Sequence, residues 1–365
     1  MCVNEKYMEA LAQYDLTVDS VRKGRSGWIC DTSLGTMLLK EYRGTLKRLE
    51  FETQVLGQVA ESGLVRVDDY IATAEGSLIS LGDDGTRYVL KHWFTDRECN
   101  LKEWREILQA VRQIARLHKT LRQIPVSEEW NLGSILVESM DQEMERHNQE
   151  LKRARNYIKN KKKKTEFERC IMNSFPLFYD QAIEAWQGMC QLTGNGGKTG
   201  IGKSAGNGSM DGSAGKDSMD GNVGKVSVDG TEETLAAGLQ LCHGCLDHHH
   251  ILLGNSYVAF IEFNKMHLGS QMTDLYHFMR KVMEKQDWNL ELGEEMITSY
   301  DRILPLAQSD RDFLYYLFLY PEKYWKQINF YYNARKAWIP VRNMEKIQTL
   351  ENQTESRLRF LGILR

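Results

Sequence analysis

Residues able to do chemistry crowd into one short stretch late in the chain, HGCLDHHHILL at 243–253. Its cysteine and histidines could bind a transition metal, and Cys242 with Cys245 has the spacing of a redox pair. The same stretch also fits a phosphoryl-transfer loop, His-Gly-Asp-x-x-x-x-Asn, in which Cys245 replaces the aspartate and His250 the asparagine. The three interpretations differ on whether the protein is an enzyme.

Spacing disfavours the metal and redox interpretations. Structural zinc sites usually join two ligand pairs a dozen or more residues apart, whereas Cys242, Cys245 and His248–His250 all fall within nine residues. A reactive Cys-x-x-Cys pair opens a helix after a strand, where its thiolate is stabilised, and this pair lacks that context. We therefore expect no metal site in this stretch and no redox role for its cysteines.

A second motif suggests phosphate binding but lacks the necessary context. GKTGIGKS at 197–204 matches the pattern G-x-x-x-x-G-K-[ST] letter for letter. That loop works only between a buried strand and a helix, and the flanking residues fit neither. The motif lies inside 191–234, which has no aromatic residue and repeats Ser-Met-Asp-Gly. We expect a disordered insertion, because this tract cannot offset an ordering entropy of about 1–2 kcal/mol per residue.

The segments around these motifs show two patterns of apolar residues, one typical of strands and one of helices. Up to about residue 96 the pattern is strand-rich, with a strong hairpin signal at Asp84-Gly85. One helix is expected over 46–62, with Thr45 as its N-cap and Gly63 as its stop. Later apolar spacing is helical, apart from one strand pair after the insertion. This order predicts a bilobal α+β fold of the protein-kinase type, with a small β-rich lobe carrying one helix and a large helical lobe.

The expected domain limits follow from where these patterns change along the sequence. We place the small N-terminal lobe at 1–96, the first part of the large lobe at 97–190, the insertion at 191–234 and the rest of the large lobe at 235–365. The aromatic residues between 315 and 338 have helical spacing, which favours a packed core over an exposed assembly surface.

Composition argues against several classes of protein. The net charge of −3 gives no basic field to attract nucleic acid, and no apolar run reaches the roughly 18 residues of a membrane span. The four lysines at 161–164 are typical of a solvated helix end. The first residues have no apolar signal region, and seven cysteines are too few and odd in number for a disulfide framework. We expect a reducing compartment, and no nucleic acid or membrane partner.

Several stretches resemble the CotS-type spore coat proteins of clostridia, which share the kinase-like fold of aminoglycoside phosphotransferases. The matching stretches are MLLKEYRGTLKRLEFETQVL, RYVLKHWFTDREC, RARNYIKNKKKKTEFE, LCHG with the following HH and ILL, DLYHFMRKVMEKQDW and YPEKYWKQINFYYNARKAWI. They cover most of the chain outside the insertion. The resemblance implies a structural or assembly role in the spore coat, other coat proteins as partners, synthesis in the mother-cell cytoplasm and deposition in the coat.

The resemblance also implies roles for single residues. Lys40, at the end of TMLLK, stands where such folds place the lysine that holds the α- and β-phosphates. Glu52 is the expected helix partner of that lysine, with Glu50 as a second candidate. Asp274, in TDLYHF, resembles the aspartate that braces the backbone of the catalytic loop, and His243 is the histidine that opens the loop.

Three positions depart from this pattern. Cys245 is a poor base, because a thiol with a pKa of about 8.5 lacks the charge of a carboxylate. His250 offers nitrogen where Mg²⁺ prefers oxygen. Glu262, in FIEFN, keeps the charge of the second metal-binding aspartate but adds a methylene. Asp247 lies two residues beyond the base position and could reach it only if the loop were remodelled.

These departures lead us to predict a catalytically degenerate kinase that is not an enzyme and holds no metal. Its cofactor is expected to be either absent or ATP, bound by Lys40 and Glu52 with little dependence on Mg²⁺. The alternative is a small-molecule phosphotransferase, of the aminoglycoside or choline type, that uses ATP with unconventional catalytic residues.

Overall fold

The computed structural model describes residues 6–194, 239–333 and 340–365. The strands are β1 (Val18–Lys23), β2 (Trp28–Thr32), β3 (Gly35–Glu41), β4 (Arg66–Val67), β5 (Tyr70–Ile71), β6 (Ser80–Leu81), β7 (Arg87–His92), β8 (Arg97–Glu98), β9 (Gln240–Cys242), β10 (Ile251–Leu253), β11 (Val258–Phe260) and β12 (His267–Gly269). The helices are α1 (Lys6–Leu11), α2 (Leu46–Glu61), α3 (Trp104–Leu121), α4 (Leu132–Ile135), α5 (Met140–Asn160), α6 (Glu166–Leu192), α8 (Met272–Lys285), α9 (Leu290–Asp301), α10 (Gln308–Leu319), α11 (Glu322–Asn333), α12 (Pro340–Asn352) and α13 (Thr354–Leu361), with a 3-10 turn η1 (His248–His250).

The small lobe is built on an antiparallel sheet in the order β1-β2-β3-β7-β5, with β6 paired to the other end of β7. The hairpin predicted at Asp84-Gly85 joins β6 to β7, and Gly85 takes a φ of +75° that favours glycine. The expectation of a single helix in this lobe is wrong. Helix α1 packs against the sheet as well, with Tyr7 stacked on Trp28 at 4.4 Å between ring centroids.

Helix α2 confirms the predicted helix and both of its ends. The Thr45 side chain accepts a hydrogen bond from the backbone N–H of Arg48, and Gly63 follows the helix with a φ of +64°. Its apolar face, with Phe51 and Val55, belongs to the large core that continues into the helical lobe. Helix α2 therefore connects the two lobes rather than serving the small one alone.

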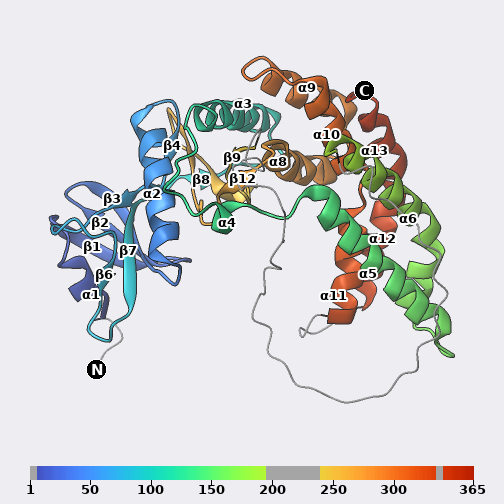
Figure 1. The fold of residues 1–365 in the computed structure, drawn as a ribbon, viewed down its shortest axis with the longest axis horizontal. Helices are drawn as coiled ribbons and strands as arrows, with labels where there is room; N and C mark the ends of the chain where they lie inside the picture. The colour runs from blue at the N-terminus through green and yellow to red at the C-terminus, as the bar shows by residue number, and fades with distance from the viewer. Residues whose placement is uncertain (1–5, 195–238, 334–339) are drawn as a thin grey trace.

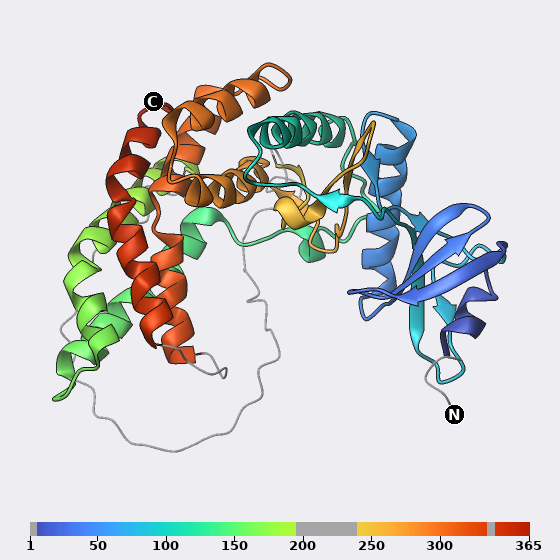
Figure 2. The same cartoon turned by 180° about the vertical axis from the view of Figure 1, so that it is seen from behind.

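A four-stranded sheet in the order β4-β11-β10-β8 lies where the lobes meet (Figures 1 and 2). Strand β4 runs parallel to β11, with Arg66 opposite Ala259, and β8 runs antiparallel to β10, with Glu98 opposite Leu252. The central pair β10 and β11 is the strand pair predicted after the insertion. Because this sheet takes strands from both sides of residue 96, main-chain hydrogen bonds tie the early part of the chain to the later loop region.

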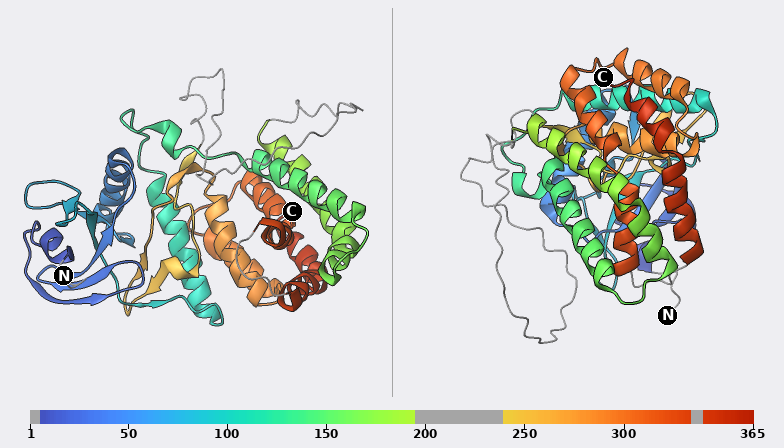
Figure 3. Two further views of the ribbon diagram at one scale, coloured as in Figure 1. Left: turned by 90° about the horizontal axis from the view of Figure 1, so that it is seen from below. Right: turned by 90° about the vertical axis from the view of Figure 1, so that its right-hand side faces the viewer.

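The remaining residues form a helical lobe. Helices α3 and α8 lie nearest the four-stranded sheet, and α5, α6 and α10–α13 form its far end (Figures 1 and 3). The aromatic residues expected to be core are buried where the structure describes them, for example Tyr315, Tyr320 and Tyr324. Among the described helices, none is long and apolar enough to cross a membrane. From residue 195 on, the predicted insertion and its GKTGIGKS motif lie outside the described residues.

Candidate functional site

The loop that follows β9 is held by a carboxylate from the first turn of α8. Asp274 is fully buried and accepts hydrogen bonds from the backbone N–H of His243 at 2.7 Å and of Gly244 at 2.9 Å. Burial raises the pKa of Asp274, but the nearby His118 and His243 and the Gly244 N–H outweigh it and hold the pKa below its usual range. Asp274 is thus an ionised brace for the loop backbone, in the geometry that the sequence resemblance implies.

The first two residues of the loop are fixed by packing as well. His243 is fully buried, its Nε2 lies 3.0 Å from the carbonyl oxygen of Ile261, and burial lowers its pKa to about 4. Gly244 has a φ of +87°, and a Cβ there would come within 2.0 Å of the Lys265 carbonyl oxygen. The neutral His243 ring and Gly244 therefore position the loop, while the side chains that could do chemistry follow them.

Lys40 and Glu262 meet across the two lobes. Lys40, on β3, places its Nζ 2.6 Å from Oε2 of Glu262, which follows β11, and both side chains are partly exposed. Burial raises the pKa of Glu262, but the ion pair with Lys40 more than offsets this and lowers it. The pair is thus charged and in contact with solvent.

The expected pairing of Lys40 with Glu52 is wrong. The Glu52 carboxylate is buried and is already satisfied within its own neighbourhood: Oε1 accepts from Arg48 Nε, one turn earlier on α2, and Oε2 from the Tyr70 hydroxyl, both at 2.6 Å. Glu50, the second candidate, is exposed. Arg48 also donates to the carbonyl oxygen of Met266 at 2.6 Å. Glu52 therefore orients Arg48, which links the lobes, and does not pair with Lys40.

The backbone at Glu262 is strained, and a buried carboxylate from the small lobe holds it in place. Its φ is +67°, a conformation that L-residues rarely adopt, and its N–H donates to Oδ2 of Asp68 at 2.9 Å. Asp68 is fully buried and also accepts from Lys91 Nζ at 2.7 Å. Strain that surrounding contacts maintain is concentrated at functional sites. Neither Asp68 nor Lys91 was predicted, because no motif in the sequence marks them.

Asp247 and His250 form a carboxylate–imidazole pair within one turn of the loop. Asp247 Oδ1 accepts from the backbone N–H of His249 at 2.9 Å and lies 3.0 Å from Nδ1 of His250. Burial raises the pKa of Asp247, but these contacts overcome that effect and hold it well below its usual range. The centroids of the His250 and His243 rings lie 5.5 Å apart. Cys245, between them in the sequence, is half-buried. Asp247 is therefore an ionised partner of His250.

The donor set fits a magnesium ion only in part. Glu262 supplies the carboxylate oxygens that Mg²⁺ prefers, whereas His250, at the other expected ligand position, supplies nitrogen. A metal ion at this place would therefore depend on Glu262 and on the phosphate oxygens of a nucleotide.

Comparison with known proteins gives likeness at the level of structure. No protein-family model and no curated protein matches the chain. An aminoglycoside phosphotransferase from Alicyclobacillus acidocaldarius subsp. acidocaldarius is similar, with a TM-score of 0.75, 15% identity, and 97% of this chain and 94% of that one covered. An AMP-bound spectinomycin phosphotransferase has a TM-score of 0.60 at 11% identity, covering 98% and 99%. A microcompartment-associated aminopropanol kinase has a TM-score of 0.54 at 12% identity, covering 98% of each chain.

These likenesses contradict the prediction that the protein is not an enzyme, because the similar structures are, by name, phosphotransferases and kinases. That prediction equated three replaced residues with lost activity. The structure retains a braced loop, a charged cross-lobe pair at Lys40 and a carboxylate–imidazole contact at His250. The chain has the bilobal kinase-like fold of the aminoglycoside phosphotransferases.

Proposed function

We propose that this protein is a small-molecule phosphotransferase that transfers the γ-phosphoryl group of ATP to a hydroxyl acceptor. The observation that carries the proposal is the 2.6 Å contact of Lys40 with Glu262, residues 222 apart in sequence. In kinase-like folds a strand lysine holds the α- and β-phosphates, and a carboxylate after the loop strands serves the metal. The named activities of the structural neighbours support the same class of reaction.

Each charged group has a distinct role in this proposal. Lys40 releases Glu262 when the nucleotide enters and binds the phosphates instead. Glu262 would hold Mg²⁺, which supplies neutralisation of the phosphate charge when it is bound. Asp274 keeps the loop backbone in place, so that the acceptor and the phosphate meet in a fixed geometry.

His250 acts as the base in place of the missing aspartate. Nδ1 of His250 lies 3.0 Å from the Asp247 carboxylate but outside hydrogen-bond geometry in this structure, so in this proposal the ring turns to donate its Nδ1 proton to Asp247 and presents the lone pair of Nε2. The proton of the acceptor hydroxyl moves to Nε2 as the oxygen bonds to phosphorus and the bond to the ADP oxygen breaks. Asp247 stabilises the imidazolium that results. Cys245, at the nominal base position, has no such carboxylate partner among its described contacts.

The test is ATP turnover by the purified protein against a panel of aminoglycosides and small amino alcohols, with and without Mg²⁺. We expect acceptor-dependent ADP formation, lost on Lys40→Met and reduced by about 10²–10⁴ on His250→Ala, the usual contribution of a general base. Glu50→Gln, an exposed acid on the same helix as Glu52, should leave turnover unchanged.

Two results would overturn the proposal. If no acceptor in the panel raises ADP formation above that of Lys40→Met, the fold is not used for phosphoryl transfer to such hydroxyls. If turnover is present but His250→Ala retains it while Cys245→Ser loses it, the base has been assigned to the wrong residue.

The resemblance to CotS-type proteins supports a second, compatible proposal about location. We infer that the protein is made in the mother cell and deposited in the spore coat beside other coat proteins. A fluorescently tagged copy should surround the forespore and remain in purified spores. A diffuse signal in vegetative cells, with none in spores, would contradict this inference.

A further inference from the structure

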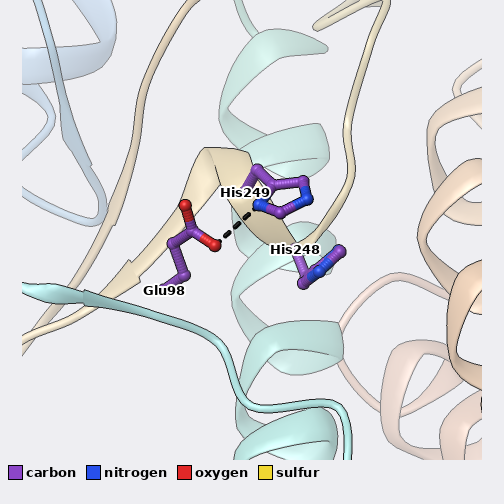
Figure 4. Close-up of side chains that lie close together, drawn as sticks. All are labelled: Glu98, His248 and His249. Carbon is purple, nitrogen blue, oxygen red and sulfur yellow. Dashed lines mark hydrogen bonds and ion pairs between the residues drawn. The ribbon is translucent and has the colours of Figure 1, made fainter. Parts of the chain in front are cut away.

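Three potential metal ligands meet beside the loop, outside the set used above. Glu98 comes from β8, and His248 and His249 come from turn η1. One ligand atom from each of the three lies within 4.8 Å of the other two. Figure 4 shows the three side chains next to one another, with the contact between His249 and Glu98 marked.

Main-chain pairing brings Glu98 to the histidines across about 150 residues of sequence. Strand β8 pairs with β10, which follows η1 directly, and Glu98 stands opposite Leu252. The N–H of Cys99 donates to the carbonyl oxygen of Ile251 at 3.0 Å and fixes the same register. The η1 turn is itself held by Asp247, which accepts the His249 N–H. The cluster is therefore built on backbone hydrogen bonds.

The hydrogen bonding inside the cluster is incomplete. His249 Nδ1 lies 2.6 Å from Glu98 Oε2, with the two side chains 49% and 45% exposed. His248 Nδ1, in contrast, is shielded from solvent and has no hydrogen-bond partner among the described residues. A shielded imidazole nitrogen without a partner is costly, and coordination of a metal ion would satisfy it.

We propose that Glu98, His248 and His249 bind a Zn²⁺ ion. Two imidazoles and one carboxylate are the ligand set of zinc sites that keep a fourth position open. Ligand atoms at about 2.0–2.1 Å around tetrahedral zinc lie about 3.3 Å from one another. The 2.6 Å pair must open by about 0.7 Å and no other pair must close by more than about 1.5 Å, which side-chain rotation supplies at an open site.

Such an ion would connect the segment that joins the lobes to the turn that carries His250. The ion shares no ligand with the Lys40–Glu262 pair, so the inference does not depend on the proposed phosphoryl transfer. The zinc ligands that the sequence offers within 242–250 all lie within nine residues. Glu98 adds a ligand from a distant segment, which the spacing of those residues does not show.

The test is zinc binding by the full chain without a histidine tag, measured by titration calorimetry and by metal content after dialysis. We expect one Zn²⁺ per chain and a higher unfolding temperature when zinc is present. Glu98→Gln and His248→Gln should each weaken binding by more than the about 10–100-fold that loss of an outer-shell partner causes. His267→Gln, a histidine outside the cluster, and Cys245→Ser should bind as the wild type does.

Thermal unfolding without zinc checks that each variant is folded. If Glu98→Gln is destabilised, Glu98→Asp serves as the second variant, because it keeps the carboxylate but shortens its reach and should bind zinc more weakly. Zinc lost on Cys245→Ser but kept on Glu98→Gln would move the site to the cysteines and overturn the proposal. A wild type that binds no zinc, or binds it no better than His248→Gln, would overturn it as well.

Discussion

Replacing Asp274 by asparagine should destabilise the protein strongly, because the carboxylate is fully buried and holds two backbone donors of the loop. Hydrogen bonds to a charged group contribute about 1.5–3 kcal/mol each. Asparagine keeps one acceptor oxygen, but its NH₂ group turns a donor toward the other N–H, so one bond is lost and the second is weakened. We expect a loss of about 3–4 kcal/mol, a large share of the 5–15 kcal/mol typical of a folded domain.

The assay is urea unfolding followed by tryptophan fluorescence, with the shift in midpoint converted through the slope of the transition. Asp180→Asn is the matched control, since Asp180 is exposed on α6 and its change should stay within about 0.5 kcal/mol. Phosphoryl transfer measured on folded Asp274→Asn should fall as well, because the loop loses its fixed geometry. A stability loss below about 1 kcal/mol would refute the reasoning that an ionised Asp274 braces the loop.

Three further predictions concern pH, the insertion and the replaced positions. Burial lowers the pKa of His243 from 6.5 to about 4, so on acidification the unfolded chain binds the proton first. The contribution of His243 to folding stability is therefore fully present above pH 6.5 and should fall by on the order of 3 kcal/mol as the pH drops to 4. An unchanged urea midpoint at pH 4.5 would contradict this. Replacing 195–234 by a short Gly/Ser linker should leave the unfolding temperature within a few degrees, since loop closure changes by only about 0.6 kcal/mol per doubling of length; a large drop would show that the tract takes part in the fold. The triple change Cys245→Asp, His250→Asn and Glu262→Asp should raise Mg²⁺-dependent ATP binding in calorimetry, because it restores oxygen ligands; equal affinity with and without Mg²⁺ would show that these positions do not serve a metal.

Local features of the fold could be predicted from sequence. The limits of α2 follow from Thr45 and Gly63, and the β6–β7 hairpin follows from Asp84-Gly85, because caps and turns are set by neighbouring residues. The order of strand-rich and helical segments was enough to predict the bilobal fold. These signals depend on a few neighbouring residues, so they can be recognised in a sequence without knowledge of tertiary contacts.

The site was harder to predict, because its partners are distant in sequence. Lys40 was assigned Glu52 by analogy with a motif, but Arg48, one turn before Glu52, takes that carboxylate, and Lys40 pairs with Glu262 instead. Glu98 carries no motif and becomes a neighbour of His249 only through the β8–β10 pairing. Competing partners of this kind are decided by tertiary packing, which a single sequence does not display.

The parallel pairing of β4 with β11 has a consequence for synthesis on the ribosome. Arg66 lies opposite Ala259, so these partners are 193 positions apart (259 minus 66). At about 5–20 residues per second, β4 waits roughly 10–40 s for its partner to be made. Helix α2 does not wait for that long, because it already contacts β4, β5 and α3, which are all complete by Leu121. The nascent chain therefore carries β4 without its β11 partner for that time, so the sheet between the lobes forms late in synthesis.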